Sequence, residues 1–326
     1  MRVTHPPELA ERPGEGRSVG QDGAVPRLGT CYGFEVISDL SFEYLRDGSG
    51  DPLLVEEAAA SSFVTTGDPI KSWDPVPGKR SLTQLFRENG SFFVEIGGSH
   101  RFRVDPGAGR IRMCASQELR QRELLLWTTP AAIGVTLRGD VAIHAAAVEI
   151  AGRAVLLISP SGYGKSTLAA AFFRRGYRVL ADDFGCCRAG VEPVVFPGPA
   201  LLRVSRDVAS RLECADTYCA YEGSTKLHLA MAPSRRGDAE PVPLAGIVFL
   251  RHSSDAVALE PVPAKIALRD LWAMSFHLPG EGEMARYFRD LADLLARVPA
   301  WNLSRDLKWH ALDAAVERIV DEVTAE

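Results

Sequence analysis

A glycine-rich loop that ends in Lys-Ser-Thr lies near the middle of the chain, in the stretch LLISPSGYGKST at residues 156–167. It departs from the phosphate-binding pattern G-x-x-x-x-G-K-[ST] only at the first glycine, where Ser159 stands. In such a loop, consecutive backbone N–H groups converge on an anion at the start of a helix, whose dipole adds partial positive charge. The residues expected to bind the phosphates of a nucleotide are Ser161, Gly162, Tyr163, Gly164, Lys165, Ser166 and Thr167.

The side chains of this loop have distinct expected tasks. Gly162 and Gly164 permit the backbone angles of the turn, and a serine at position 159 is small enough if its own angles stay ordinary. Lys165 is expected to reach the β and γ phosphates of ATP, and the Ser166 hydroxyl to ligate Mg²⁺. The loop therefore predicts ATP and Mg²⁺ as cofactors, against the alternative of a chance glycine-rich turn.

Two adjacent carboxylates, Asp182 and Asp183, form the second chemical signal. They end the segment YRVLADD at residues 177–183, which we expect to be a buried strand, parallel and adjacent to the strand that feeds the loop. One carboxylate could then help to hold Mg²⁺, and the other could take a proton from an attacking hydroxyl. The alternatives are the acidic pair of a simple ATPase and a cap for a following helix.

The segments around the loop have the periodicity of a phosphate-binding α/β unit. Two apolar runs at residues 141–150 and 153–158 are expected to be strands joined by a tight turn at Ala151-Gly152. After the loop, LAAAFFRRG reads as a helix that ends at Gly176. The order of elements is therefore strand, loop, helix, strand and acidic pair.

Composition excludes several classes of function. The 326 residues are 46% hydrophobic and 24% charged, with a formal net charge of -5, and they contain no basic stripe of the kind that binds nucleic acid. No apolar run reaches the length of a membrane helix, and the first residues do not resemble a signal peptide, so we expect a cytoplasmic protein. The six cysteines lack C-x-x-C spacing and predict neither zinc nor a disulfide framework.

The chain divides into three predicted regions. Residues 1–27 are rich in Pro, Gly, Glu and Arg and are expected to be a disordered tail. Residues 28–118 have short strand-like runs separated by turn signals and predict a small β-rich domain, although its stretch 47–79 is loop-rich and has no assigned fold. Residues 119–326 hold the phosphate-binding unit.

Helices and one further strand are expected around that unit. Residues 117–138 read as helical, with a kink or break at Pro130. In the last third, PLAGIVFLR predicts a buried strand, and residues 264–277, 284–297 and 309–323 have helical periodicity.

The ordered set of His144 in AIHAAAVEI, then SPSGYGKST, then RGYRVLADD resembles the catalytic domain of the HPr kinase/phosphorylase family. The resemblance covers residues 141–183 closely and the rest of the chain to its C-terminus more loosely. It implies an α/β fold: a P-loop kinase domain of the HPr kinase and phosphoenolpyruvate carboxykinase type, here preceded by the small β-rich domain. The resemblance also implies that this chain could form a homo-oligomer.

Roles for individual residues follow from this resemblance. Lys165 and Ser166 match the lysine and serine of the family loop, and His144 matches the histidine upstream of it. Asp182 matches the general base for a substrate hydroxyl, and Asp183 the carboxylate that assists at the metal. Catalytic residues implied in this way are Asp182, Asp183, His144 and Lys165, with Ser166 and Asp183 at the metal.

Other segments depart from the bifunctional family. PGPALLRVS, STKLHL and PVPLAGIVFLR, together with CYGFEVISDL near the N-terminus, resemble the shorter HPr-kinase-like proteins of bacterial peptide biosynthesis clusters, including kinases that tailor lasso precursor peptides. HPr itself is then not the expected substrate. Arg203 and Lys226, in the first two of these segments, could add positive charge to a nucleotide site.

The sequence thus predicts an ATP- and Mg²⁺-dependent kinase that phosphorylates a hydroxyl, with serine near the end of a biosynthetic peptide as the preferred acceptor and a small molecule as another. In this interpretation Asp182→Asn retains nucleotide binding but loses transfer. Two alternatives stay open. A P-loop ATPase would release phosphate without an acceptor, and a nucleotide-gated binding module would bind ATP without turnover. Neither membrane nor nucleic acid is an expected partner.

Overall fold

The structure of the protein is a computed structural model that describes residues 25–73, 83–105, 109–115, 119–223, 225–253 and 256–325. The disordered tail expected for residues 1–27 lies almost wholly outside these ranges, and Arg27 already begins the first strand. Residues 74–79 of the loop-rich stretch also lie outside them.

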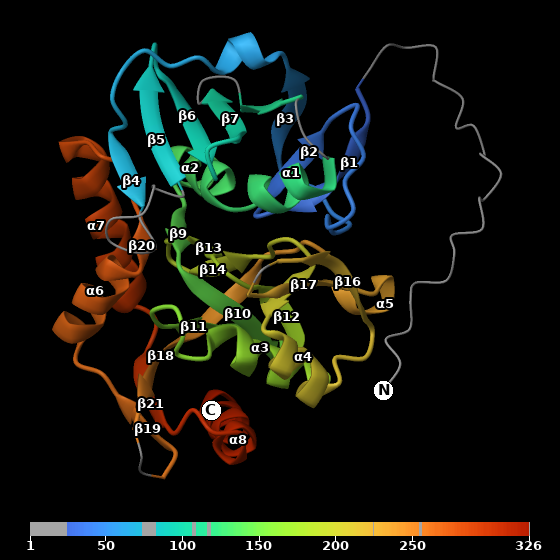
Figure 1. Ribbon diagram of the computed structural model, residues 1–326. Helices are drawn as coiled ribbons and strands as arrows, with labels where there is room; N and C mark the ends of the chain where they lie inside the picture. Colours follow the sequence, from blue (N-terminus) through green and yellow to red (C-terminus); the bar gives the residue numbers. More distant parts are fainter. Residues whose placement is uncertain are drawn as a thin grey trace, which may run out of the picture.

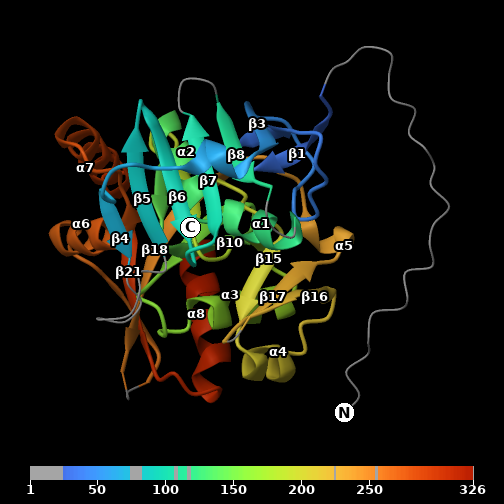
Figure 2. The same cartoon turned by 45° about the horizontal axis from the view of Figure 1, so that its top comes forward.

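The first eight strands form one twisted sheet, drawn in blue to cyan in Figure 1 and seen from another side in Figure 2. Its spatial order is β1-β2-β3-β8-β7-β6-β5-β4. The strands are β1 (Arg27–Cys31), β2 (Phe34–Ile37), β3 (Asp51–Ala58), β4 (Lys71–Trp73), β5 (Thr83–Glu88), β6 (Ser91–Ile96), β7 (His100–Asp105) and β8 (Arg110–Cys114). Alternation sets the buried face, since Phe102 and Val104 of β7 point inward and their neighbours do not.

Strand β3 falls within the segment that has no fold assigned from sequence. Leu53 and Val55 alternate with more exposed residues along it, as expected for a strand with one buried face. Pro52 and the charged residues at its end obscure this short pattern in the sequence. A 3₁₀ turn, η1 (Ala60–Phe63), follows β3.

Helices α1 (Leu119–Leu126) and α2 (Thr129–Arg138) connect this sheet to the rest of the chain. They confirm the break predicted at Pro130, which stands in the first turn of α2, where its missing N–H costs no hydrogen bond. Helix α2 contacts β6 and β7 on one side and β9 on the other, so it lies between the two halves of the molecule (Figure 1).

A ten-stranded sheet forms the second half. Its main order is β12-β10-β11-β18-β14-β13-β9-β20, and β21 and β19 extend it from β18. The strands are β9 (Val141–Ile143), β10 (Ala145–Ile150), β11 (Arg153–Ile158), β12 (Arg178–Ala181), β13 (Gly185–Arg188), β14 (Val194–Phe196), β18 (Val242–His252), β19 (Ala258–Pro261), β20 (Ser275–Phe276) and β21 (Ala300–Arg305).

The position of β12 corrects one prediction. It runs in the same direction as β11, as expected, but the two strands are not adjacent, because β10 pairs with both of them in antiparallel fashion. The cause is the turn at Ala151 and Gly152, whose φ angles of 49° and 77° are those of a two-residue hairpin turn. That hairpin occupies the edge of β11 on which β12 would otherwise pair.

The remaining elements surround this second sheet. A third, three-stranded sheet has the order β15-β17-β16. Its strands and the remaining helices are β15 (Leu201–Val204), β16 (Thr217–Glu222), β17 (Leu227–Met231), α3 (Lys165–Arg174), α4 (Arg206–Leu212), α5 (Pro233–Arg236), α6 (Ala264–Ala273), α7 (Glu281–Leu295) and α8 (His310–Thr324). In the described ranges, no helix has the length and apolar character needed to cross a bilayer.

Strand β11 shows how the two halves share their interior. Leu156 and Ile158 face a core that also holds side chains of the first sheet, α2 and α7. Val155 and Leu157 face a second core formed with α3 and α8. Because every side chain of its second half is buried on one face or the other, β11 holds the loop that follows it in a fixed place.

Candidate active site

The glycine-rich loop connects the end of β11 to the start of α3. Gly162 and Gly164 have φ angles of 92° and 83°, a region that other residues rarely adopt, so both glycines are required by the turn. Ser159 keeps an ordinary backbone conformation outside that region, as the sequence interpretation required. The loop, the first turn of α3 and strand β15 surround a cavity of about 160 Å³, which we call the loop cavity.

Lys165, the first residue of α3, is held by two acceptors. Its ammonium group donates to the Ser159 carbonyl at 2.9 Å and to Nε2 of His144 at 3.0 Å. His144 stands between β9 and β10, where the chain passes from one part of the sheet to the other. Its Nδ1 lies 2.8 Å from the Asp183 carbonyl, which can only accept, so Nδ1 carries the proton and Nε2 is free to accept from Lys165.

This arrangement requires a neutral imidazole. Burial, and then the charge of Lys165, lower the pKa of His144 below its usual value of 6.5. Burial likewise lowers the pKa of Lys165, against the opposing charges of Asp182 and Asp183. The lysine therefore has few protein partners for its charge, as expected of a group that is completed by a phosphate.

Asp182 is buried below the loop, and each of its carboxylate oxygens accepts one hydrogen bond. Ser166 donates its hydroxyl to Oδ1 at 2.9 Å, and the Arg203 backbone N–H donates to Oδ2 at 2.8 Å. Burial raises the pKa of Asp182 above its usual value, although these two donors oppose the change. Asp182 is 3% exposed and does not line the loop cavity.

Asp183 has the opposite environment. Its φ of 93° is unusual for a residue other than glycine, and such strain is concentrated at functional sites. The side chain is 35% exposed, lines the loop cavity and forms an ion pair with the Arg203 guanidinium. Burial alone would raise the pKa of Asp183, but the positive charge of Arg203, and then that of Lys226, lowers it overall.

Ser166 and Asp182 together have the chemistry of a P-loop magnesium site. Mg²⁺ in nucleotide sites keeps several waters and takes only one or two protein oxygens in addition to the phosphates. The Ser166 hydroxyl and a carboxylate oxygen already lie 2.9 Å apart at the start of α3. These two residues fit the ion, whereas the sequence interpretation pairs Ser166 with Asp183.

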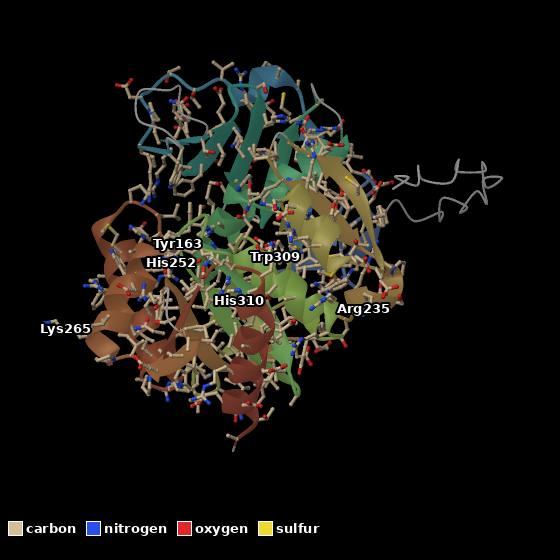
Figure 3. The ribbon with its side chains drawn as sticks, turned by 60° about the horizontal axis from the view of Figure 1, so that its bottom comes forward. Tyr163, Arg235, His252, Lys265, Trp309 and His310 are labelled. Atoms are coloured by element: carbon tan, nitrogen blue, oxygen red, sulfur yellow. The ribbon has the colours of Figure 1, made fainter. Side chains whose placement is uncertain are left out.

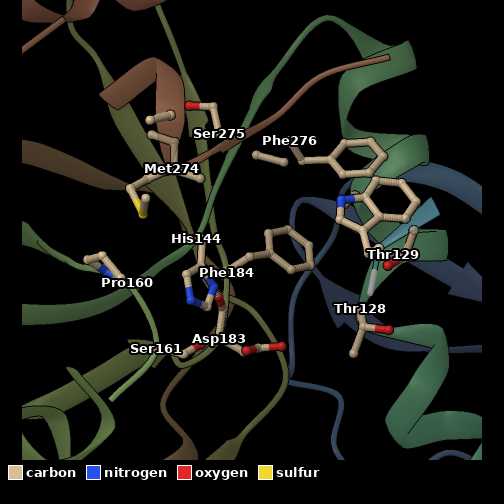
Figure 4. A pocket seen from close by; sticks show the side chains of 15 residues that line it. Thr128, Thr129, His144, Pro160, Ser161, Asp183, Phe184, Met274, Ser275 and Phe276 are labelled. Atoms are coloured by element: carbon tan, nitrogen blue, oxygen red, sulfur yellow. Dashed lines mark hydrogen bonds between the residues drawn. The ribbon is translucent and has the colours of Figure 1, made fainter. Parts of the chain in front are cut away.

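A second and larger cavity, of about 440 Å³, adjoins the loop cavity (Figure 4). We call it the acceptor cavity. His144, Ser161 and Asp183 line both cavities. Figure 4 shows these three side chains gathered at one end, with Phe276 at the other. A group bound in one cavity can therefore meet a group bound in the other at these residues.

The structure brings most of the predicted residues together. The loop cavity is lined by His144, Ser161, Gly162, Gly164, Lys165, Ser166, Thr167, Asp183, Arg203 and Lys226. Tyr163 lies apart from them. It is 40% exposed and lines a separate cavity with Pro160, Leu250, Arg251 and His252. Figure 3 shows Tyr163 next to His252.

Arg305, at the end of β21, is a residue that the sequence interpretation missed. It is 2% exposed, and its guanidinium packs so closely on the loop that a Cβ on Gly164 would lie 2.5 Å from Nη2. Among the residues that the structure describes, the guanidinium donates only to the Asp306 carbonyl and forms no ion pair. The sequence signal, a lone arginine after the run WNLS, is too weak to single it out.

Alanine substitutions at the two glycines should separate backbone strain from this contact. Either substitution places a side chain at positive φ, which costs roughly 1–2 kcal/mol. A Cβ at Gly162 meets no atom within 4 Å, whereas one at Gly164 must displace Arg305. We therefore expect Gly164→Ala to lower the free energy of unfolding and the affinity for ADP more than Gly162→Ala does, measured by chemical denaturation and calorimetry. Equal losses in both variants would contradict the packing of Arg305 on the loop.

Comparison with known proteins shows no family for this chain. The sequence matches no protein-family profile, and no curated protein is significantly similar to it. Among solved structures, the Hpr(Ser) kinase/phosphatase from Coxiella burnetii aligns with 57% of this chain and 99% of its own, at 10% identity and a TM-score of 0.33. This similarity is too low to assign the function of that enzyme to this chain.

Proposed function

We propose that this protein is a kinase that transfers the γ-phosphoryl group of Mg-ATP to a hydroxyl of a separate acceptor. The observation that carries the proposal is the junction of two cavities at His144, Ser161 and Asp183. A simple ATPase needs a phosphate site and a water, but it has no use for a second cavity of about 440 Å³ that opens onto the same carboxylate.

The loop side of the junction is suited to the triphosphate. The positive end of the α3 dipole and the Lys165 ammonium face the position of the phosphates, where charge develops during transfer. Ser166 and Asp182 would hold Mg²⁺, which neutralises phosphate charge and orients the reacting group. Arg203 and Lys226 also line the loop cavity and add positive charge to it.

His144 acts through Lys165 in this proposal. Its neutral ring accepts a hydrogen bond from the ammonium and keeps it pointed at the loop, while Nδ1–H anchors the ring to the Asp183 carbonyl. His144 is therefore a positioning residue, whose loss would misplace the lysine without removing its charge.

Asp183 is the residue proposed to receive the acceptor. It faces both cavities, whereas Asp182 is buried and lines neither of them, so we exchange the roles that the resemblance implies for the two carboxylates. During transfer the bond between the γ-phosphorus and the bridging oxygen of ADP breaks, and a bond from the acceptor oxygen forms. The hydroxyl proton passes to Asp183, and the products are ADP and a phosphoester.

Membership of the HPr kinase/phosphorylase family, in its shorter peptide-tailoring group, is part of the proposal. Membership of the family is supported by His144, the SPSGYGKST loop and the Asp182-Asp183 pair, which occur in the family order and lie together at the start of α3. The narrower group is supported by the segments PGPALLRVS, STKLHL, PVPLAGIVFLR and CYGFEVISDL. The acceptor proposed on this basis is a serine near the end of a biosynthetic precursor peptide.

The test is the intact mass of short peptides encoded beside the gene, after incubation with the protein and Mg-ATP. A gain of one phosphate that is absent with Lys165→Ala supports the proposal. Phosphate release without an acceptor, at a rate that peptide does not change, would show an ATPase instead. Tight ATP binding without any turnover would indicate a binding module.

A further inference from the structure

The ionisable side chains that line the acceptor cavity lie at one end of it. Its wall at the junction carries the neutral His144 imidazole and the Asp183 carboxylate, and no other ionisable side chain in the described ranges lines it. The rest of the wall consists of apolar and aromatic groups, with Thr128, Thr129 and Ser275 between them. A volume of about 440 Å³ falls within the range of roughly 300–1,000 Å³ that is typical of small-ligand sites.

The aromatic end of the cavity is built from both halves of the protein. Trp73 at the end of β4 and Phe276 of β20 stack with their ring centres 5.9 Å apart and their planes 21° apart. The Lys71 ammonium lies 5.0 Å from the centre of the Trp73 ring and 5.9 Å from that of Phe276, which favours this arrangement through cation–π attraction. The two rings thus form a fixed apolar wall opposite the junction.

A third aromatic ring, Phe184, forms the wall next to the catalytic carboxylate. It stacks on Tyr32 at 4.1 Å between ring centres, and Tyr32 is fully buried. Because Phe184 directly follows Asp183, the ring fixes the surface on which an acceptor would lie as its hydroxyl reaches the carboxylate. Figure 4 shows Phe184 between His144 and Phe276.

From this geometry we infer that the acceptor of the proposed kinase carries its hydroxyl close to an aromatic or branched apolar group, which fills the Trp73–Phe276 end of the acceptor cavity. The inference rests on the proposed function. An uncharged polar group or a cation at that end would lose its water without gaining a partner, and the nearby Lys71 ammonium would repel the cation, whereas an apolar group gains from burial. Acceptors with a positively charged neighbour of the hydroxyl are therefore discriminated against.

Two variants and a matched control test this inference. Phe276→Ala removes half of the aromatic wall, and Ala273→Trp narrows the cavity from an exposed position at the end of α6, where a large side chain does not disturb the core. Phe288→Ala is the control, because Phe288 is 46% exposed and does not line the cavity. The acceptor probes are N-acetyl-Ser-Phe-amide, N-acetyl-Ser-Lys-amide and 3-phenylpropan-1-ol.

We expect the phenylalanine-containing peptide to be phosphorylated with at least a tenfold higher kcat/KM than the lysine-containing one. Phe276→Ala and Ala273→Trp should raise its KM about tenfold, with the KM for ATP unchanged, and Phe288→Ala should change neither value. Preference for the dipeptide over the alcohol would identify a peptide acceptor, and the reverse preference a small molecule. Transfer to the two peptides with equal efficiency, unaffected by either variant, would overturn the inference and leave the kinase proposal intact.

Ligand binding is measured separately, so that failure of the kinase proposal can be recognised. Saturation-transfer NMR with 3-phenylpropan-1-ol, in the absence of nucleotide, reports occupancy of the cavity without chemistry. If no probe is phosphorylated, a signal that Ala273→Trp abolishes and Phe288→Ala preserves would support an apolar ligand site while the kinase proposal fails. A signal that is absent, or that Ala273→Trp does not change, would overturn the inference.

Discussion

Replacing Asp183 with asparagine is expected to lower the rate of phosphoryl transfer on the order of 100- to 10,000-fold while the affinity for Mg-ATP stays close to that of the wild type. The amide keeps the size of the carboxylate but cannot accept the hydroxyl proton. The proposed metal oxygens of Ser166 and Asp182 are untouched by this change, so nucleotide binding should persist. Single-turnover transfer from labelled ATP measures the rate, and calorimetry with ADP and Mg²⁺ measures the affinity.

The matched control is Asp182→Asn. Its amide can still bond Ser166 and the Arg203 backbone, but it removes the negative charge beside the proposed metal. We expect a higher KM for Mg-ATP as its main effect. Asp183→Asn also leaves the Arg203 guanidinium without its ion pair, which can destabilise the fold. The thermal midpoint of each variant is therefore measured, and both must lie well above the assay temperature. Loss of transfer in Asp182→Asn alone would restore the roles implied by the family resemblance.

The shape of the glycine-rich loop could be predicted from sequence because its geometry is local. Gly162 and Gly164 are needed at positive φ whatever surrounds them, and a strand before the loop with a helix after it follows from short-range periodicity. The break at Pro130 belongs to the same class, because proline removes a helical hydrogen bond wherever it occurs.

The different environments of Asp182 and Asp183 could not be predicted from the sequence. Alternation along a strand predicts that neighbouring side chains diverge, but it does not say which of them is buried. That choice is made by the Arg203 backbone on β15, which satisfies Asp182, and by the positive φ at Asp183, which turns its side chain toward the cavities. Both are tertiary effects, as is the pairing of β12 with β10 rather than with β11.

The acceptor cavity lay beyond sequence reasoning for a related reason. Trp73 and Phe276 are far apart in the chain and belong to different sheets, so no local pattern brings their rings together. The position of Arg305 could not be predicted either, because it depends on the pairing of β21 with β18, which places the end of β21 next to the loop. The walls of the proposed acceptor site thus come from long-range contacts, whereas the glycine-rich loop proposed to bind phosphate is a single contiguous segment.

Replacing Lys165 with alanine is expected to weaken Mg-ATP binding and to lower kcat/KM for transfer on the order of 100- to 1,000-fold. The ammonium is buried at the start of α3, bonded only to neutral acceptors, and thus faces the phosphates with little compensating charge from its hydrogen-bond partners. Lys226→Ala is the matched control. Lys226 lines the same cavity but is exposed, so water and salt screen its charge, and we expect a loss of less than about tenfold that shrinks as salt is added.

Stability distinguishes a functional lysine from a structural one. Burial lowers the pKa of Lys165 below its unfolded value of 10.5, so the unfolded chain holds that proton more firmly and the charge disfavours folding at neutral pH. Removing the charge should therefore leave the thermal midpoint of Lys165→Ala close to that of the wild type, as differential scanning calorimetry can show. A large fall in that midpoint, matching the fall in activity, would mean that Lys165 mainly supports the fold. An unchanged midpoint with lost transfer would mean that Lys165 contributes to phosphate binding and transfer and not to the stability of the fold.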